Sequence, residues 1–248
     1  MSASSSVTRL ESMLHARNLD RTVVRSLSGT PEILAETGHA ALDELLAGGL
    51  ARGHLSEIAG PRSSGRTSLL ASVLAAATGR GEVVALIDVC DRFDPVSAAA
   101  AGVELANLLW VPERARESSR DFGPSIKRAL KAMSLILDAG GFGVVVFDVA
   151  DLPVRTIRQI PMTTWLRLSR LLENTKTVGL LLGLEPIARS AEGQTVVLRP
   201  GGAVGWWSGT HDRNRLLQGL ECEARVVRTR RPCHEFVTLR PEFEKPKV

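Results

Sequence analysis

The sequence of 248 residues contains no tyrosine, and only 4% of its residues are aromatic. A bound base that depends on ring stacking therefore finds few partners in this chain. The three cysteines, Cys90, Cys222 and Cys233, are scattered singly. Their spacing provides neither a disulfide framework nor a C-x-x-C metal pattern, so we expect reduced thiols.

Long apolar runs are also missing. No stretch approaches the ~18 uninterrupted apolar residues of a membrane span, and the Ser-rich start lacks the apolar centre of a signal peptide. We therefore expect a cytoplasmic protein with no membrane partner. The hydrophobic content of 44% is enough for the core of one domain of α/β size, with small appendages.

The charge of the chain is moderately basic, with a formal net charge of +4. This balance is compatible with an acidic partner such as nucleic acid but does not establish one. Several arginines gather near the C-terminus: Arg225, Arg228, Arg230 and Arg231.

The most informative stretch runs from Gly60 to Ser68 and reads Gly-Pro-Arg-Ser-Ser-Gly-Arg-Thr-Ser. It follows a predicted strand over residues 54–59 and leads into a predicted helix over residues 67–78. This is the setting of a phosphate-binding loop, G-x-x-x-x-G-K-[ST], in which backbone N–H groups surround phosphates and a lysine reaches the terminal ones. Gly60, Gly65 and Thr67 fit that pattern, but Arg66 stands where the lysine belongs.

The rest of the chain alternates predicted strands and helices. Apolar runs predict strands over 82–89, 108–111, 143–148, 177–184 and 195–198, and helical patterns follow Gly38, begin at Asp94, and cover 125–139 and 163–174. Because these strands lack polar alternation, we expect them to be buried on both faces of a parallel sheet. The alternation predicts an α/β fold with one doubly wound domain.

The two ends differ from this pattern. Residues 1–36 are predicted to form an N-terminal helix, over about 7–18, and a linker. Residues 37–248 form the core, whose last part alternates like two antiparallel strands, over 223–229 and 234–239, with a turn between them. The expected fold is thus a mostly parallel sheet with a C-terminal antiparallel β-hairpin at about 223–240.

Several segments together resemble the RecA recombinase family. They are the Gly60 loop, Ile87-Asp88, Phe93-Asp94-Pro95, Gly102-Val103 and Asn107-Leu108-Leu109, and their order and spacing agree over residues 37–240. Within that family, the segments 168–173, 209–212 and 226–231 resemble the RecA-like accessory protein of bacterial inducible (SOS) mutagenesis cassettes, the ImuA type.

The resemblance implies a partner system. It comprises RecA, an inactive Y-family polymerase relative (the ImuB type) and an error-prone replicative-type polymerase, which act together in translesion synthesis after DNA damage. A protein of this type would be cytoplasmic and associated with the nucleoid.

The resemblance also implies a nucleotide pocket for ATP with magnesium. The matching positions are Gly60, Ser64, Gly65, Arg66, Thr67, Ser68, Asp94 and Asp148, of which Thr67 and Asp148 would hold the metal. Three positions depart from the family. Arg66 is bulkier than lysine, Cys90 replaces the glutamate that activates water, and Ser97 replaces the tyrosine that stacks on the base.

Two interpretations of the loop remain open: weak binding of ATP with magnesium, or a glycine turn kept for packing with no ligand. In neither do we expect ATP turnover, so we assign no catalytic residue. Candidates for DNA or partner binding are Arg155 and Arg158 after the strand ending at Asp148, Arg189 after the strand ending at Leu184, and the four C-terminal arginines. All of these can equally be surface charges.

The leading hypothesis is a catalytically degenerate RecA-like adaptor or regulator of the damage-induced polymerase assembly. The first alternative is an ATP-dependent, DNA-binding recombinase-like ATPase in which Arg66 replaces lysine. The second is a RecA-like cell-division inhibitor. Trp206-Trp207 is a minor candidate for a partner contact, and His211-Asp212 indicates a turn rather than acid–base chemistry.

Overall fold

The computed structural model describes residues 33–113, 122–188, 193–200, 203–209, 216–228 and 236–240. Several features singled out above lie outside the described residues: the predicted helix over 7–18, and Arg189, His211, Asp212, Arg230, Arg231 and Cys233. The side chains of Trp206 and Arg228 are also outside the description.

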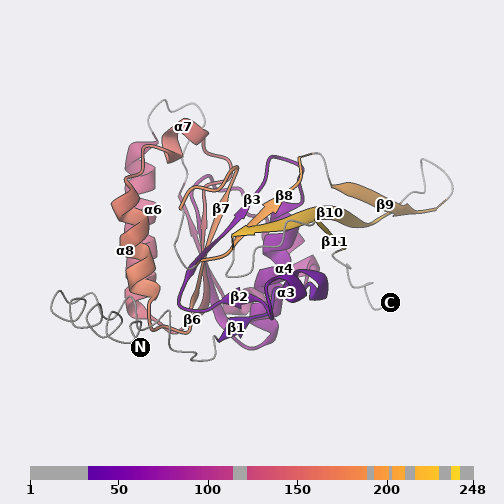
Figure 1. The fold of residues 1–248 in the computed structure, drawn as a ribbon, viewed down its shortest axis with the longest axis horizontal. Coiled ribbons are helices and arrows are strands. Elements are labelled where there is room, and N and C mark those ends of the chain that lie inside the picture. Colours follow the sequence, from indigo (N-terminus) through magenta and orange to yellow (C-terminus); the bar gives the residue numbers. More distant parts are fainter. Residues whose placement is uncertain are drawn as a thin grey trace, which may run out of the picture. The chain divides into compact units, whose positions relative to one another are not determined.

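A nine-stranded sheet forms the centre of the fold (Figure 1). Its strands are β3 (Leu55–Ala59), β4 (Val83–Asp88), β5 (Leu108–Pro112), β6 (Phe142–Asp148), β7 (Val178–Gly183), β8 (Thr195–Leu198), β9 (Val204–Ser208), β10 (Leu216–Arg228) and β11 (Val237–Leu239). Their order is β11-β10-β8-β3-β7-β6-β4-β5, and β9 pairs with β10.

The middle of the sheet is parallel. Strand β3 pairs with β7 and β8, and β4 pairs with β5 and β6, all in the same direction. Every residue of β3 and β7 is buried, as the continuous apolar runs predicted. Strand β5 lies at the edge of the sheet and is partly exposed. The carboxyl ends of β4 and β6 meet, because Asp88 is opposite Asp148.

Helices cover both faces of the sheet (Figure 1). One side carries α3 (Ala40–Leu45) and α4 (Arg66–Gly79), and the other carries α6 (Gly123–Ala139) and α8 (Met162–Leu172). Short helices α5 (Pro95–Ala100), η1 (Leu105–Asn107) and α7 (Val154–Ile157) lie in the connections. Within the described ranges, no helix is both long and apolar enough to cross a lipid bilayer.

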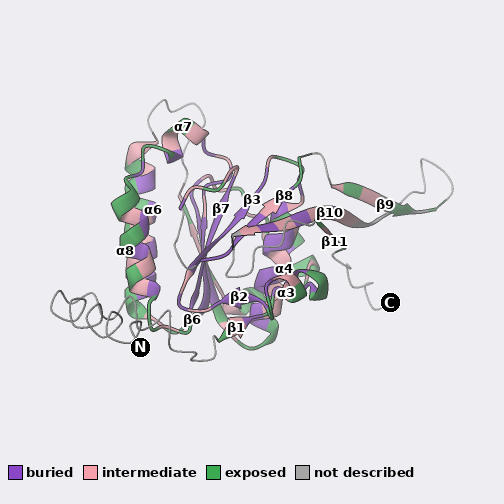
Figure 2. Ribbon diagram, in the orientation of Figure 1, coloured by how far each residue is buried: buried purple, intermediate pink, exposed green. Residues whose placement is uncertain are grey.

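Two hydrophobic clusters fill the spaces between the sheet and its helices (Figure 2). Leu74 of α4 and Val146 of β6 belong to the first cluster, whereas the next residue, Phe147, belongs to the second. Phe147 packs edge-on against Trp165 of α8, with ring centroids 6.3 Å apart. Successive residues of one strand thus enter opposite clusters, which confirms the prediction of a doubly wound α/β domain.

The predicted C-terminal hairpin forms, but it is more than an appendage. Strand β10 pairs antiparallel with β11, as expected, and also with β8 and β9. Cys222, Ala224 and Val226 of β10 are buried in the first hydrophobic cluster. The antiparallel strands therefore extend the sheet, and alternate residues of β10 contribute to the core on one of its faces.

The first described residues, from Ile33 onward, lead into a small separate sheet. Strand β1 (Leu34–Ala35) pairs antiparallel with β2 (Leu50–Ala51), and these two strands form a separate small sheet. Ala35 and Leu50 are buried in the first cluster.

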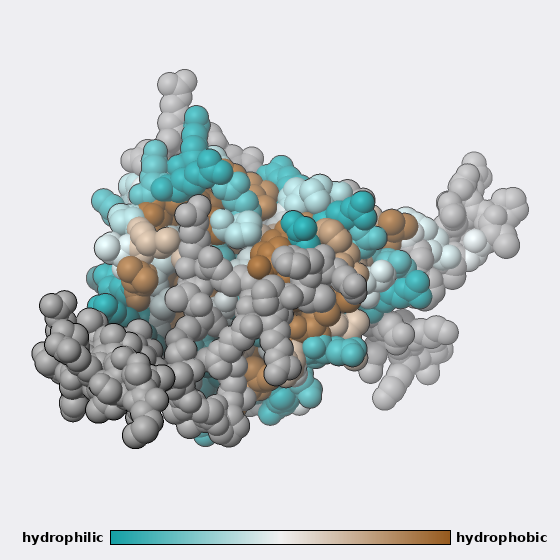
Figure 3. All heavy atoms as spheres, in the orientation of Figure 1, coloured by the Kyte–Doolittle hydropathy of each residue, from teal (hydrophilic) through white to brown (hydrophobic). Residues whose placement is uncertain are grey.

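On the face shown in Figure 3, hydrophilic residues gather around α7 and hydrophobic residues lie in several separate places.

Candidate functional site

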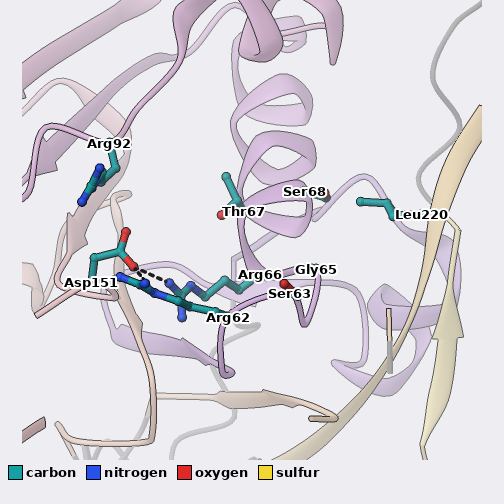
Figure 4. Close-up of a pocket in the computed structure, with 9 residues that line it drawn as sticks. All are labelled: Arg62, Ser63, Gly65, Arg66, Thr67, Ser68, Arg92, Asp151 and Leu220. Carbon is teal, nitrogen blue, oxygen red and sulfur yellow. Dashed lines mark hydrogen bonds and ion pairs between the residues drawn. The ribbon is translucent and has the colours of Figure 1, made fainter. Parts of the chain in front are cut away.

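The phosphate-type loop, residues 60–65, joins the carboxyl end of β3 to the first turn of α4 (Figure 4). Ser63 and Gly65 both have positive φ, at 62° and 91°. Positive φ is costly for most residues but not for glycine. Backbone N–H groups that curl in this way, beside a helix N-terminus, are typical of anion-binding loops. The turn that the sequence predicted is therefore present.

Packing is one reason for the two glycines of the loop. A Cβ atom at Gly65 would lie 2.9 Å from Cβ of Cys222 in β10. A Cβ atom at Gly60 would lie 3.0 Å from Cβ of Leu198 in β8 and would also collide with the Ser64 hydroxyl. The approach of β10 favours glycine at position 65, and the approach of β8 together with the Ser64 hydroxyl favours glycine at position 60, with or without a ligand.

Arg66 turns its side chain back into its own loop. The residue is only 6% exposed, and Nη1 donates to the carbonyl oxygen of Gly60 at 2.8 Å. Nη2 donates to Oδ1 of Asp151 at 3.1 Å, and Nε of Arg62 donates to the same oxygen at 3.3 Å. Figure 4 shows the two guanidinium groups converging on this carboxylate. The guanidinium of Arg66 thus spans from the first residue of the loop to the segment after β6.

A cleft of about 470 Å³ opens in front of the loop. The side chains around it combine positive charge and hydroxyl groups with one carboxylate, and its lining consists of Arg62, Ser63, Gly65, Arg66, Thr67, Ser68, Arg92, Asp151 and Leu220. Thr67 is exposed at the start of α4. Ser64 is 1% exposed, and its hydroxyl has no hydrogen-bond partner in the described part of the protein.

Two carboxylates stand at the carboxyl ends of β4 and β6. Asp88 is buried and accepts the backbone N–H groups of Cys90, Arg92 and Phe93, so it closes the turn after β4. Asp148 is partly exposed, yet burial is the main cause that raises the pKa of its carboxyl to about 7, and the nearby Asp88 adds to this effect. Asp148 therefore carries only part of its negative charge at neutral pH.

Cys90 occupies the position at which the resemblance predicts a water-activating glutamate. Burial, and then the charges of Asp151, Asp148 and Asp88, raise the pKa of its thiol to about 12. The thiol is protonated at neutral pH and cannot act as a general base. The loss of the water-activating role at this position stays a prediction from the sequence.

Asp94 serves as the N-cap of α5. Its carboxylate accepts the backbone N–H groups of Val96 and Ser97, both at 3.2 Å, and the hydroxyl of Ser97. These contacts lower the pKa of the Asp94 carboxyl, with the Ser97 hydroxyl as the largest cause. Asp94 does not line the cleft, so its predicted contact with adenine remains a prediction.

The structure brings together only some of the predicted site residues. Gly65, Arg66, Thr67 and Ser68 line one cleft. Asp148 lies close enough to Arg66 for that charge to lower its pKa, although burial outweighs this effect. Within the described ranges, no cluster of three or more histidine, cysteine or acidic side chains is arranged to hold a metal ion.

Asp151 is one of the cleft-lining residues that the sequence prediction did not assign to the site; the others are Arg62, Ser63, Arg92 and Leu220. Asp151 lies three residues beyond Asp148, outside every motif, and its importance depends on two arginines far away in the chain. The one available signal was the presence of a second acid after the strand that ends at Asp148.

Among the candidate DNA-binding arginines whose side chains the structure describes, Arg155, Arg158 and Arg225 are not part of the cleft lining. Arg155 is exposed on α7. Arg158 forms an ion pair with Glu185, with Nη2 at 2.6 Å from Oε1. The guanidinium of Arg225 in β10 lies 5.2 Å from the ring centroid of Phe236, and its Nε is buried with no hydrogen-bond partner among the described residues. The backbone of Arg228 belongs to β10.

The fold and the loop define a class: doubly wound, mostly parallel α/β proteins with a phosphate-type loop between the first core strand and its helix. Within this class, the chain belongs to the RecA family, because the RecA N-terminal domain matches residues 24–158, more than half of the chain.

Individual relatives agree with this assignment. Protein RecA of Symbiobacterium thermophilum is 41% identical over 113 residues, which is 45% of this chain and 29% of that protein. Protein RecA of Methylococcus capsulatus is 42% identical over 113 residues, or 45% and 30%. The match therefore spans less than a third of the length of these relatives.

A solved structure shows the same fold. The crystal structure of the RadB recombinase superposes with a TM-score of 0.55 and 17% sequence identity, and the alignment covers 84% of this chain and 96% of RadB. At this identity the likeness concerns the fold alone. It confirms the prediction of a RecA-like doubly wound domain.

Proposed function

We propose that this chain is a RecA-like adaptor, of the ImuA type, that acts through protein contacts in a damage-induced error-prone polymerase assembly and does not turn over ATP. The observation that carries the non-enzymatic part is the position of Arg66. Its guanidinium is bonded to Gly60 and Asp151, inside the loop that the resemblance implies would hold phosphates.

The residues present do not fit ATP with magnesium well. Asp148, which would help to hold the metal beside Thr67, has a pKa that burial raises to about 7, so magnesium binding at neutral pH would have to displace a proton from part of the molecules. The thiol of Cys90 cannot activate a water molecule. Ser97 is bound to the Asp94 carboxylate and offers no ring to a base. Three independent requirements for turnover are affected together.

The assignment to the polymerase assembly is supported by the resemblance of segments 168–173, 209–212 and 226–231 to the ImuA type. The proposed partners are RecA, the inactive Y-family polymerase relative and the error-prone replicative-type polymerase, in the nucleoid. The exposed Arg155 and Trp207, the latter 50% exposed on β9, are available for such contacts.

ATP hydrolysis tests the non-enzymatic part. Purified full-length protein is assayed with ATP, magnesium and single-stranded DNA, beside RecA as a positive control and Thr67→Ala as the matched variant. We expect hydrolysis at the background level in both forms of the chain. Robust DNA-stimulated hydrolysis that Thr67→Ala abolishes would contradict the proposal.

Partner binding tests the adaptor part. Deleting the C-terminal hairpin is unsuitable, because Cys222, Ala224 and Val226 of β10 are buried in the core. Full-length protein is therefore immobilised and offered purified RecA and the purified polymerase relative. Trp207→Ser and the similarly exposed Leu166→Ser, 54% exposed on α8, locate the contact. Retention of neither partner by the wild type would overturn the adaptor proposal.

A second candidate is an ATP-dependent, DNA-binding recombinase-like ATPase. Family membership favours it, since the relatives include proteins named RecA and the fold resembles a protein titled a recombinase. This function requires saturable binding of ATP with magnesium at physiological concentration. The hydrolysis assay, together with an ATP titration, distinguishes it from the adaptor.

A further inference from the structure

Asp151 holds the phosphate-type loop by two ion pairs. Its Oδ1 accepts Nη2 of Arg66 at 3.1 Å and Nε of Arg62 at 3.3 Å. The Asp151 side chain is 21% exposed and that of Arg66 is 7% exposed, so the pair between them is shielded from solvent. Hydrogen bonds between charged groups are stronger in such surroundings than at an open surface.

Both terminal nitrogens of the Arg66 guanidinium already have hydrogen-bond acceptors within the protein. One nitrogen bonds to the Gly60 carbonyl at the start of the loop, and another bonds to Asp151 after β6. A phosphate entering the loop would have to take Arg66 and Arg62 from this carboxylate. It would also leave Asp151 without its partners, close to Asp148.

We propose that the Asp151 carboxylate makes the arginine contacts that a phosphate would otherwise make. Because these contacts are already made within the protein, the site does not bind free phosphoanions. This inference deepens the proposed function, because it identifies the residue that closes the site. It depends on the contacts of Asp151 and not on the identity of any partner protein.

Competition explains why a single carboxylate can exclude a more highly charged ligand. Asp151 is attached to the fold, so it competes at an effective concentration on the order of millimolar or above. Asp151 also adds negative charge to its surroundings: after burial, its charge is the next largest cause that raises the pKa of the Cys90 thiol. Removing the charge of Asp151 would free two arginines and lower this negative charge.

The test is a gain of binding. Pyrophosphate is titrated calorimetrically into full-length wild type, Asp151→Asn and Glu113→Gln. Glu113 is the matched control, because its side chain is 17% exposed and bonds to Arg128 at 2.9 Å, outside the cleft lining. We expect Asp151→Asn to bind pyrophosphate at least about tenfold more tightly than the wild type and Glu113→Gln. The double variant Asp151→Asn, Arg66→Gln should lose this gain.

Three outcomes would overturn the inference: equal affinity in wild type and Asp151→Asn, weaker binding in Asp151→Asn, or a gain that survives Arg66→Gln. Thermal melting without ligand shows whether each variant folds, and Asp151→Ser replaces Asp151→Asn if the amide is not tolerated. If neither variant folds, the titration of the wild type tests the inference. Saturable binding of pyrophosphate to the wild type with a Kd below about 1 mM would contradict a site closed by Asp151. ATP hydrolysis by the wild type would contradict the proposed function, whereas an unchanged affinity without hydrolysis contradicts this inference alone.

Discussion

The interior of the parallel sheet and the segments beyond its carboxyl edge differ in the kinds of residue they contain. In β4 and β6, the residues from Val84 to Ile87 and from Val144 to Phe147 are buried and apolar, as a RecA-like core requires. Beyond the strand ends lie Arg66 of α4, Cys90 after β4 and Ser97 of α5, the three positions at which the resemblance predicts a departure from the family pattern. The residues that supply packing free energy are different from those that supply chemistry, so the fold can persist while the site changes.

The largest effect is expected in the interior. Phe147→Ala removes a fully buried ring that packs against Trp165, and we expect it to lower the free energy of unfolding by ~4 kcal/mol. Urea unfolding monitored by circular dichroism measures this change. The control is Leu135→Ala on α6, where the side chain is 59% exposed, with an expected change within ~0.5 kcal/mol. Equal losses in the two variants would remove the distinction between interior and surface.

A smaller effect is expected at the edge, and it depends on pH. Burial raises the pKa of Asp148 to about 7, so between about pH 4 and 7 the folded state holds a proton that the unfolded state releases. The wild type should therefore lose stability as the pH rises through this window. Asp148→Asn keeps an oxygen to accept the Ala150 N–H and should be more stable than the wild type by ~2 kcal/mol at pH 8.

Unfolding curves at pH 5 and pH 8 test this prediction. The advantage of Asp148→Asn should shrink at pH 5, where the wild-type carboxyl is protonated in the folded state. An advantage of the same size at both values would show that the pKa of Asp148 is not raised. Asp148 would then be charged at neutral pH and suited to binding magnesium. The difference between the buried, apolar interior and a chemically altered carboxyl edge would be smaller.

The smallest expected effect concerns the thiol at the edge. With a pKa of about 12, Cys90 has little thiolate at pH 8, and we expect iodoacetamide to alkylate it at least about tenfold more slowly than in the urea-unfolded chain. Mass spectrometry of the peptide containing Cys90 measures both rates. Cys222, whose pKa burial raises to about 11, is an internal comparison with a fully packed thiol. Fast labelling of Cys90 alone would indicate a reactive site.

The sequence by itself determined the class of fold and most of its elements. Apolar runs without alternation, such as residues 143–148, marked strands buried on both faces, because in a doubly wound sheet each face meets a helix layer. Predicted helices over 67–78 and 125–139 agree with α4 and α6 to within two residues, since the periodic apolar positions and the glycines that end these helices are local features.

Only the tertiary structure decided how the phosphate-type loop is held. The contact between Arg66 and Asp151 joins residues 85 positions apart, and no local pattern encodes it. The close approach of Cys222 to Gly65 is likewise a tertiary contact, which adds to the local demand of the positive φ, because β10 enters the core through its pairing with β8. Secondary structure follows from nearby residues, whereas the state of this site depends on which distant charges the fold places side by side.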